Sequence, residues 1–498
     1  MGVIKRQSIK QSLANYFGVA IGAISTLFIF PMAPDEIGLL RFVIAAATLA
    51  LPFVSMGVGI TVVRFFPEFE NKENNHNGLL GFSLIIILVG FCVFLGLVYL
   101  FRDTIFKFYS QKPAEYLDYL SFAIPLVLML AFIQLLKFHT SNFHRVVVPF
   151  IANELFLKLL LPTLILLFVW NYIGIGAMVN GLMVGYFLIV TMMTAYLWYL
   201  GELRISFKFP LLKNKDLRKR IGAFTLYSLL GSLGAVLAFQ IDVFMVGSIQ
   251  TMYATGVYTM SLFIANTIDV PSRALFSIAA PIISKAWNDE NMDEIRDLYT
   301  RSSINLFVIG AFFFLLIWMN VDDLFSILPK GDVLMEGKYV IFFIAISKLI
   351  TQLTGINNVI INYSKYYRFN LYAILVLAVV NISLNLYLIP QYPITGAAIA
   401  TMISLILFNL MKVAFLYFRY KMHPFSFKTI LALALTGLCY FLLTILPSTS
   451  HALLNIFIKS FTLVVVFGGL TLYLNLSSDI SQLVKGHLAK LQSMLLGK

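Results

Sequence analysis

Apolar stretches of 20 or more residues recur from one end of this chain to the other. About 20 apolar residues are what an α-helix needs to cross the hydrocarbon core of a bilayer, and a helix satisfies its own backbone hydrogen bonds there. Composition agrees, because 60% of the residues are hydrophobic and only 12% are charged, whereas about a quarter are charged in soluble domains. The 498 residues therefore predict an all-α integral membrane protein rather than a series of soluble domains.

Hydrophobic windows predict about fourteen transmembrane helices. The first six windows cover residues 12–32, 37–63, 78–101, 117–138, 146–170 and 173–200. The next six cover 221–247, 253–281, 303–327, 339–362, 369–390 and 393–418, and a final pair covers 429–447 and 452–475. The first window lacks a small-residue cleavage site and has full membrane length, so we expect it to remain as a helix and not to be removed as a signal peptide.

The Lys and Arg residues predict which loops face the cytoplasm, because cytoplasmic loops carry an excess of positive charge. With a cytoplasmic N-terminus, six of the 36 basic residues fall in outward loops, four fall within spans, and the remaining 26 face inward. Residues 477–498 are expected to form an amphipathic tail on the inner face, so both termini are expected in the cytoplasm. The linker 202–220 is expected to contact anionic membrane lipids through Arg204, Lys208, Lys213, Lys215, Arg218, Lys219 and Arg220.

An internal repeat relates the two groups of six spans. The segment from Glu36 matches the segment from Ala254 at an offset of 218 residues, with Gly38 over Gly256. The segment from Ile173 matches the one from Pro393 at an offset of 220. The repeat predicts two pseudo-symmetric six-helix bundles in the same orientation. The expected divisions are a first bundle at 1–201, a basic linker at 202–220, a second bundle at 221–420, helices thirteen and fourteen at 421–476, and the tail at 477–498.

Two segments carry a resemblance to a known family. NISLNLYLIPQYPITGAAIATMIS, from Asn381, and EIGLLRFVIAAATLALPFVSMGVGITVVRFFPEF, from Glu36, are similar to segments of the oligosaccharide flippases of the multidrug/oligosaccharidyl-lipid/polysaccharide (MOP) exporter superfamily. The resemblance implies a V-shaped pair of bundles that opens alternately to the two faces. It also implies an undecaprenyl-pyrophosphate-linked oligosaccharide as substrate, carried from the cytoplasmic to the outer face of a bacterial inner membrane for O-antigen, capsule or exopolysaccharide. Polysaccharide polymerase and export machinery are the protein partners that it suggests.

Charged residues inside the predicted spans are the candidate site, since a charge at the bilayer centre must be paired or face water. Arg273 follows Asp269 by four residues, and Lys158 follows Glu154 by four, so each pair can form an ion pair within its helix. Each pair is interpreted either as a packing element or as part of a cavity that binds the pyrophosphate. Arg273 is the leading candidate, because a guanidinium binds phosphate bidentately and Pro271 favours a bend beside it.

Four further residues complete the candidate set. Lys348 lies near the middle of its predicted span and has no opposite charge close to it in the sequence. It is therefore expected to face water or a carboxylate on another helix. Arg41 and Arg64 lie toward opposite ends of the second span and are expected to contact headgroups or substrate. Asp242 is interpreted either as an interfacial cap or as the site of a proton or sodium ion that drives transport.

Three functions remain open from the sequence. The leading one is the flippase; the alternatives are a cation-coupled multidrug or toxic-compound antiporter of the same superfamily and a membrane glycan polymerase or ligase. The predicted outward loops are short and the sequence carries no Walker loop, nucleophile elbow or metal-spaced His/Cys cluster, so we expect no enzyme activity, cofactor or metal. The charge of +13 is assigned to membrane orientation, and no nucleic-acid partner is expected.

Overall fold

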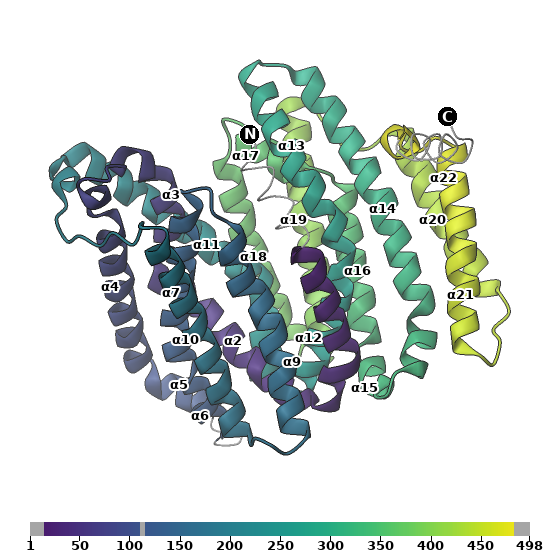
Figure 1. Ribbon diagram of the computed structural model, residues 1–498. Helices are drawn as coiled ribbons and strands as arrows, with labels where there is room; N and C mark the ends of the chain where they lie inside the picture. Colours follow the sequence, from purple (N-terminus) through teal and green to yellow (C-terminus); the bar gives the residue numbers. More distant parts are fainter. Residues whose placement is uncertain (1–13, 110–114, 483–498) are drawn as a thin grey trace, which may run out of the picture. The chain divides into compact units, whose positions relative to one another are not determined.

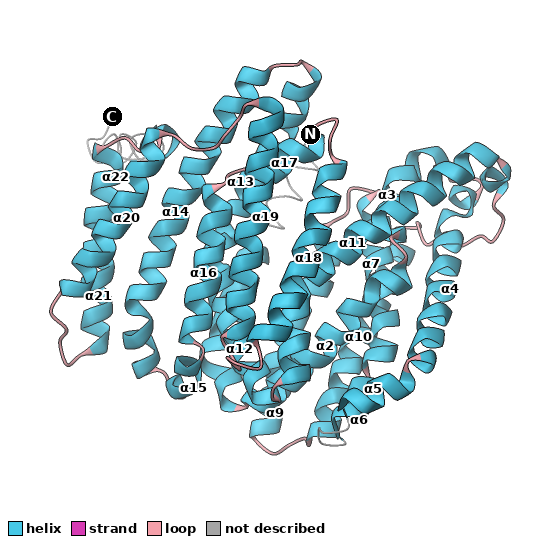
Figure 2. Cartoon of the chain, turned by 180° about the vertical axis from the view of Figure 1, so that it is seen from behind, coloured by secondary structure: helices cyan, strands magenta, loops and turns pink. Residues whose placement is uncertain are grey.

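The computed structural model describes residues 14–109 and 115–482, drawn in colour in Figure 1. Within these ranges the side chains of Phe108, residues 115–117, Arg273, Ala274 and Ser277 lie outside the description. Every regular element of the described residues is a helix, as Figure 2 shows. The predicted all-α class is therefore confirmed, while most of the predicted tail lies outside the described residues.

The chain divides into two compact units, Met1–Thr259 and Met260–Lys498. The first unit contains α2 (Pro34–Ser55), α3 (Val58–Phe69), α4 (Leu79–Leu100), α5 (Arg102–Tyr109), α6 (Glu115–Ser121), α7 (Ala123–Ser141), α8 (Val147–Phe150), α9 (Phe156–Val169), α10 (Ile175–Tyr199) and α11 (Lys215–Ile249). The division falls within α12 (Met252–Asn266). The second unit continues with α13 (Val270–Asn288), α14 (Met292–Ile327), α15 (Gly331–Glu336), α16 (Lys338–Leu353), α17 (Asn357–Tyr363), α18 (Arg368–Leu388), α19 (Gly396–Tyr420), α20 (Phe427–Ile445), α21 (Ala452–Leu463), η7 (Val464–Gly468) and α22 (Gly469–Tyr473).

Twelve helical segments among the described residues are long and apolar enough to cross a membrane. Each coincides with one of the predicted spans, beginning with Ala14–Met32. The predicted span 339–362 is instead a pair of helices, α16 and α17, that meet at a bend of 51°. The predicted span 253–281 is divided into α12 and α13 by the short turn η6 (Thr267–Asp269). The two differences from the predicted count are therefore both broken helices.

Helix α2 is the centre of the first unit, where it packs against α4, α7 and α11. Its continuation into α3 is interrupted at Met56 and Gly57, whose φ angles are 46° and 73°. A Cβ atom at Gly57 would lie 2.7 Å from the backbone nitrogen of Leu229, so the left-handed turn and the close passage of α11 both require glycine. Because α11 packs along α2 and α3, the division into units falls after α11. The bundle boundaries inferred from the repeat remain a prediction.

Gly38 and Gly256, which the repeat superimposes, each pack against the segment that contains the other. A Cβ atom at Gly38 in α2 would lie 1.9 Å from the carbonyl oxygen of Met252, at the start of α12. Reciprocally, a Cβ atom at Gly256 would lie 2.0 Å from the carbonyl oxygen of Pro34. Each glycine therefore meets the carbonyl four residues before its counterpart, which is the pattern that a two-fold axis between the two segments produces.

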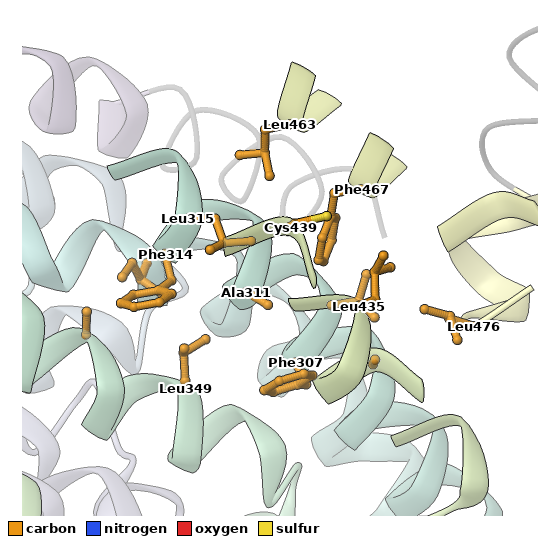
Figure 3. Close-up of a cluster of buried hydrophobic side chains, with 14 of the residues drawn as sticks. Phe307, Ala311, Phe314, Leu315, Leu349, Leu435, Cys439, Leu463, Phe467 and Leu476 are labelled. Atoms are coloured by element: carbon orange, nitrogen blue, oxygen red, sulfur yellow. The ribbon is translucent and has the colours of Figure 1, made fainter. Parts of the chain in front are cut away.

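In the second unit, the terminal pair of spans packs on α14 and α16. Figure 3 shows Phe307 and Phe314 of α14 in one buried cluster with Leu435 of α20 and Phe467 of η7. At the other end of the same contact, Lys459 of α21 lies 2.5 Å from Asp323 of α14. The cluster and this ion pair fix helices thirteen and fourteen to the unit.

Candidate functional site

A broken helix and its partner form the most polar intramembrane site of the second unit. The turn η6 separates α12 from α13, and Pro271 stands in the first turn of α13. A proline is tolerated there because the first amide groups of a helix have no intrahelical acceptor. The Gln352 side-chain amide, on α16, donates hydrogen bonds of 3.0 Å to the Ile268 carbonyl and to Ser272 Oγ. Gln352 therefore holds the two sides of the break together.

The position of Gln352 depends on a glycine in a third helix. A Cβ atom at Gly310 of α14 would lie 1.5 Å from Gln352 Oε1, so any larger residue would displace this side chain. Gln352 is 2% exposed, and a buried amide that loses its partners is costly. The break in the helix is thus supported by α14 and α16 together.

Beside this break, Lys348 forms an ion pair with Asp269. Lys348 Nζ lies 2.7 Å from the Asp269 carboxylate, and the two side chains retain 20% and 24% of their exposure. Lys348 thus meets a carboxylate of another element, one of the two environments expected for it. The spacing also allows Asp269 to pair with Arg273. The backbone of Arg273 lies in α13, but its side chain lies outside the described residues, so this pair stays a prediction. Removing either Lys348 or Asp269 would leave a mostly buried charge uncompensated, which is costly.

A second broken helix lies just beyond this ion pair. Gly355, with a φ angle of 61°, stands between α16 and α17. Asn409 of α19 bridges the break: its Oδ1 accepts from Thr354 Oγ1 at 3.0 Å and from Asn357 Nδ2 at 3.4 Å. Polar side chains on both sides of the bend therefore find a partner on a neighbouring helix, as polar groups within a membrane require.

The sequence interpretation missed Lys412, which lies beside this second break. Lys412 is 2% exposed in α19, and its Nζ atom lies 3.0 Å from Asn358 Oδ1 and 3.6 Å from the centre of the Phe408 ring. Lys412 lies within the predicted span 393–418, but it is one of the 26 basic residues assigned above to the cytoplasmic side. Its place in that span, eight residues from the end of α19, was the available signal.

The first unit holds the other candidate residues at separate places. Arg41 is half-buried in α2, and Arg64 is exposed on α3 with its guanidinium 4.3 Å from the centre of the Phe224 ring. Glu154 accepts a hydrogen bond of 3.1 Å from Asn153. Lys158 is half-buried beside the first span, where a Cβ atom at Gly18 would lie 3.1 Å from its Nζ.

Asp242 is buried in α11, with 5% of its surface exposed, and accepts a hydrogen bond of 3.3 Å from Tyr258. It lies seven residues before the end of α11. Its two expected roles, as an interfacial cap and as the site of a coupling ion, both stay predictions.

A cluster of charges at the predicted cytoplasmic end was also missed by the sequence interpretation. Glu202 accepts from Lys72 at 3.0 Å and from His76 at 3.1 Å, and Arg204 lies 3.6 Å away. Burial alone would raise the pKa of Glu202, but the hydrogen bonds from His76 and Lys72 and the charge of Lys72 hold this pKa below the usual range of a glutamate. His76 lies in a left-handed Asn-His-Asn-Gly turn, residues 75–78, and this turn was the signal in the sequence.

Several of these arrangements hold a cation in a fixed position, where an anion can contact it. Among the described residues, no group of three or more His, Cys, Asp or Glu side chains is placed to hold a metal ion. The intramembrane cation Lys348 has a carboxylate that an anionic ligand can replace, and hydrogen bonds to charged groups are the stronger ones.

Comparison with known proteins agrees with this fold. The chain is similar to the lipid II flippase MurJ in an inward closed conformation, with a TM-score of 0.68, 14% identity, and coverage of 93% of this chain and 98% of that one. It is also similar to an inward-facing multidrug resistance MATE family transporter of the MOP superfamily, with a TM-score of 0.60, 14% identity, and coverage of 82% and 94%. At these identities the similarity shows the fold.

Sequence comparison defines the family. The chain is 24% identical over 294 residues to the probable low-salt glycan biosynthesis flippase Agl15 of Haloferax volcanii, covering 58% of this chain and 60% of that protein. The profile of the MatE family matches residues 228–387. The profile described as polysaccharide biosynthesis protein matches residues 13–287, more than half of the chain. This chain therefore belongs to the polysaccharide biosynthesis protein family, in agreement with the predicted resemblance to the oligosaccharide flippases.

Proposed function

We propose that this protein is a flippase that carries an undecaprenyl-pyrophosphate-linked oligosaccharide, by alternating access, from the cytoplasmic to the outer face of a bacterial inner membrane. The observation that carries the proposal is the mostly buried ion pair between Lys348 and Asp269 at a broken helix. Broken membrane helices are typical of transporter binding sites. The family of this chain, and its similarity to the flippases Agl15 and MurJ, support the same proposal.

The ion pair gives a physical route for the pyrophosphate. Without substrate, Asp269 neutralises Lys348 and makes the cation tolerable within the membrane. A pyrophosphate that enters the site takes the place of the carboxylate, so that Lys348 exchanges one anionic partner for another. Arg273, in the first turn of α13, is proposed as the second phosphate ligand, and Lys158, Arg41 and Arg64 as cations of the path.

The proposal also covers the orientation of the protein in the membrane, its lipid and protein partners, and the ion that drives transport. Both termini are placed in the cytoplasm, the basic linker contacts anionic lipids, and polysaccharide polymerase and export machinery receive the product. Transport is coupled to a proton or sodium gradient, for which Asp242 is the candidate site. The protein acts as a transporter and not as an enzyme.

Deletion of the gene tests this function in the cell. The expected result is lipid-linked oligosaccharide accumulating on the cytoplasmic face and loss of surface glycan. Complementation with Lys348→Ala is expected to restore protein abundance but to leave transport about 10- to 100-fold lower, the effect of losing a charge-assisted contact of about 1.5–3 kcal/mol. Lys338→Ala is the matched control, because Lys338 begins the same helix and pairs with Asp322 at 2.6 Å on the surface. Normal surface glycan in the deletion strain would refute the proposal.

A second candidate function is the cation-coupled multidrug antiporter, which the MatE match over residues 228–387 favours. The two functions predict different phenotypes. An antiporter deletion would sensitise cells to toxic cations and leave lipid-linked oligosaccharide on its normal side of the membrane.

A further inference from the structure

Two apolar cavities lie between α2, α4 and α11 in the first unit. The larger, of about 550 Å³, is lined by Ala46 and Ala50 of α2, Phe94 and Val98 of α4, and Phe244 of α11. The smaller, of about 300 Å³, is lined by Met56, Phe82, Ile86, Gly222 and Leu229. In both Figure 1 and Figure 2, α4 runs along the margin of this unit. Helices α4 and α11 line both cavities, α2 lines the larger one and reaches the smaller one only at its C-terminal end, and α5, α6 and α7 complete the larger one.

The order of the lining residues places the cavities one above the other across the membrane. On α4, Phe82 and Ile86 of the smaller cavity precede Gly90, and Phe94 and Val98 of the larger cavity follow it. At Gly90 the two helices touch, since a Cβ atom there would lie 2.4 Å from the carbonyl oxygen of Val54. From Phe82 to Val98 the helix rises about 24 Å, close to the ~30 Å of the hydrocarbon core. The cavities therefore lie toward opposite ends of α4, on either side of the Gly90 contact.

Each cavity has an arginine at its membrane-surface end. Arg102 follows the end of α4 and stacks over Phe106, with its guanidinium 5.2 Å from the ring centre, and both residues line the larger cavity. Arg218 is exposed in the first turn of α11 and lines the smaller cavity. An apolar cavity that ends in a guanidinium complements a lipid with a phosphate headgroup, since a guanidinium binds phosphate bidentately.

We propose that these two cavities bind the polyprenyl chain of the lipid-linked substrate, with the phosphate beside Arg218 in the inner leaflet and beside Arg102 in the outer leaflet. This inference rests on the proposed function. Membrane phospholipid needs no site in both leaflets along one helix, whereas a flipped lipid must be held before and after it crosses. The chain then moves from one cavity to the other along α4, past the Gly90 contact, while the polar headgroup crosses within the protein.

Photolabelling tests the proposal with full-length protein in phosphatidylcholine vesicles. The probe is an undecaprenyl phosphate analogue with a diazirine in its chain, and labelled peptides are mapped by mass spectrometry. Labels are expected on α4 and α11 around the two cavities. Ala50→Phe should reduce labelling of the larger cavity, and Gly222→Leu labelling of the smaller one, by about fivefold or more, a loss of about 1 kcal/mol. Val89→Phe is the control, because Val89 is 52% exposed on α4 and lines neither cavity.

Two further measurements distinguish specific binding of the probe from misfolding of a variant and from binding of other lipids. The surface substitutions Arg102→Gln and Arg218→Gln should reduce labelling by the phosphate probe and leave labelling by the corresponding polyprenyl alcohol unchanged. Excess unlabelled undecaprenyl phosphate should remove the label, whereas equal phosphatidylglycerol should not. Equal competition by phosphatidylglycerol would identify a general phospholipid site and overturn the proposal.

Failure here and failure of the proposed function are distinguishable. Lys348→Ala should lower transport about 10- to 100-fold and keep the photolabel. If Ala50→Phe and Gly222→Leu lose the label but keep full transport, the polyprenyl chain takes another path, and the flippase assignment stands. Normal surface glycan after gene deletion would remove the flippase assignment itself, whatever the labelling shows.

Discussion

At the scale of single residues, the membrane charges show what a sequence can and cannot predict. Lys348 is identifiable because a lysine at mid-span has to be paired or hydrated. Its partner Asp269 was harder to predict, because Arg273 lies only four residues from Asp269 in the sequence, whereas Lys348 lies two predicted spans further on. Spacing along one helix describes only neighbours on that helix, whereas the structure joins Asp269 to Lys348 at 2.7 Å. Lys412 was missed because a residue counted as part of a loop is not examined as an intramembrane charge.

The cytoplasmic cluster around Glu202 gives a pH-dependent prediction. The pKa of Glu202 is lowered in the folded protein, so its contribution to stability is present above the usual glutamate range and is lost as the pH falls through the folded-state pKa. Glu202→Gln should lower the free energy of unfolding by about 1–3 kcal/mol at neutral pH, because His76 and Lys72 lose a charged acceptor.

Thermal unfolding of the purified protein in detergent checks this prediction. The difference in unfolding temperature between wild type and Glu202→Gln should close as the pH falls below the usual pKa range of a glutamate, because the folded-state pKa of Glu202 is lowered. Asp293→Asn is the control, because Asp293 forms its ion pair with Arg296 at the surface, with 92% of the carboxylate side chain exposed. A difference that persisted at low pH would show that Glu202 acts through packing instead of charge.

At the scale of elements, hydropathy predicted the helices and missed their breaks. Twelve predicted spans coincide with single helical segments because a window of apolar residues reports length and polarity. A window averages over a turn of three residues such as η6, and it cannot report that Gln352 on another helix satisfies the freed carbonyl of Ile268. Pro271 and Gly355 were the local signals of the breaks, but the partners that stabilise them are distant in sequence.

The support of η6 gives a prediction about two residues on neighbouring helices. Gly310→Ala should displace Gln352, lower transport and reduce stability by about 1–3 kcal/mol, because the amide loses both acceptors. Gln352→Ala should have a similar effect alone. The double variant should be no less stable than either single one, because the methyl group added by Gly310→Ala occupies the space that the Gln352 side chain leaves. Strictly additive losses in a double-mutant cycle would show that the two residues do not act together.

The paired glycines give a second prediction at this scale. Gly38→Ala and Gly256→Ala should each destabilise the protein by about 1–3 kcal/mol, because each new Cβ atom would lie 2.0 Å or less from a backbone oxygen. Gly437→Ala on α20 is the control, since nothing lies within 4 Å of its Cβ position, and alanine there should be neutral or stabilising. Equal unfolding temperatures for all three variants would contradict the close approach of the two segments.

At the scale of the whole molecule, the sequence predicted the fold class and the family, and the structure adds the contacts of each unit. The repeat offset of 218 residues superimposes Gly38 on Gly256, and the structure brings these two glycines to reciprocal contacts. Duplication is readable from sequence because it leaves matched segments at a constant offset. The division into units after Thr259 was not readable, because it depends on how α11 packs along α2.

Flipping of a lipid-linked oligosaccharide by the purified protein tests the central claim most directly. Proteoliposomes would carry a fluorescent undecaprenyl-pyrophosphate-linked oligosaccharide in both leaflets, with a membrane-impermeant quencher added outside. The protein should make the inner-leaflet pool accessible to the quencher, Lys338→Ala should do the same, and Lys348→Ala should slow the process about 10- to 100-fold. An inner-leaflet pool that stays protected in vesicles with wild-type protein, as in protein-free vesicles, would contradict the account.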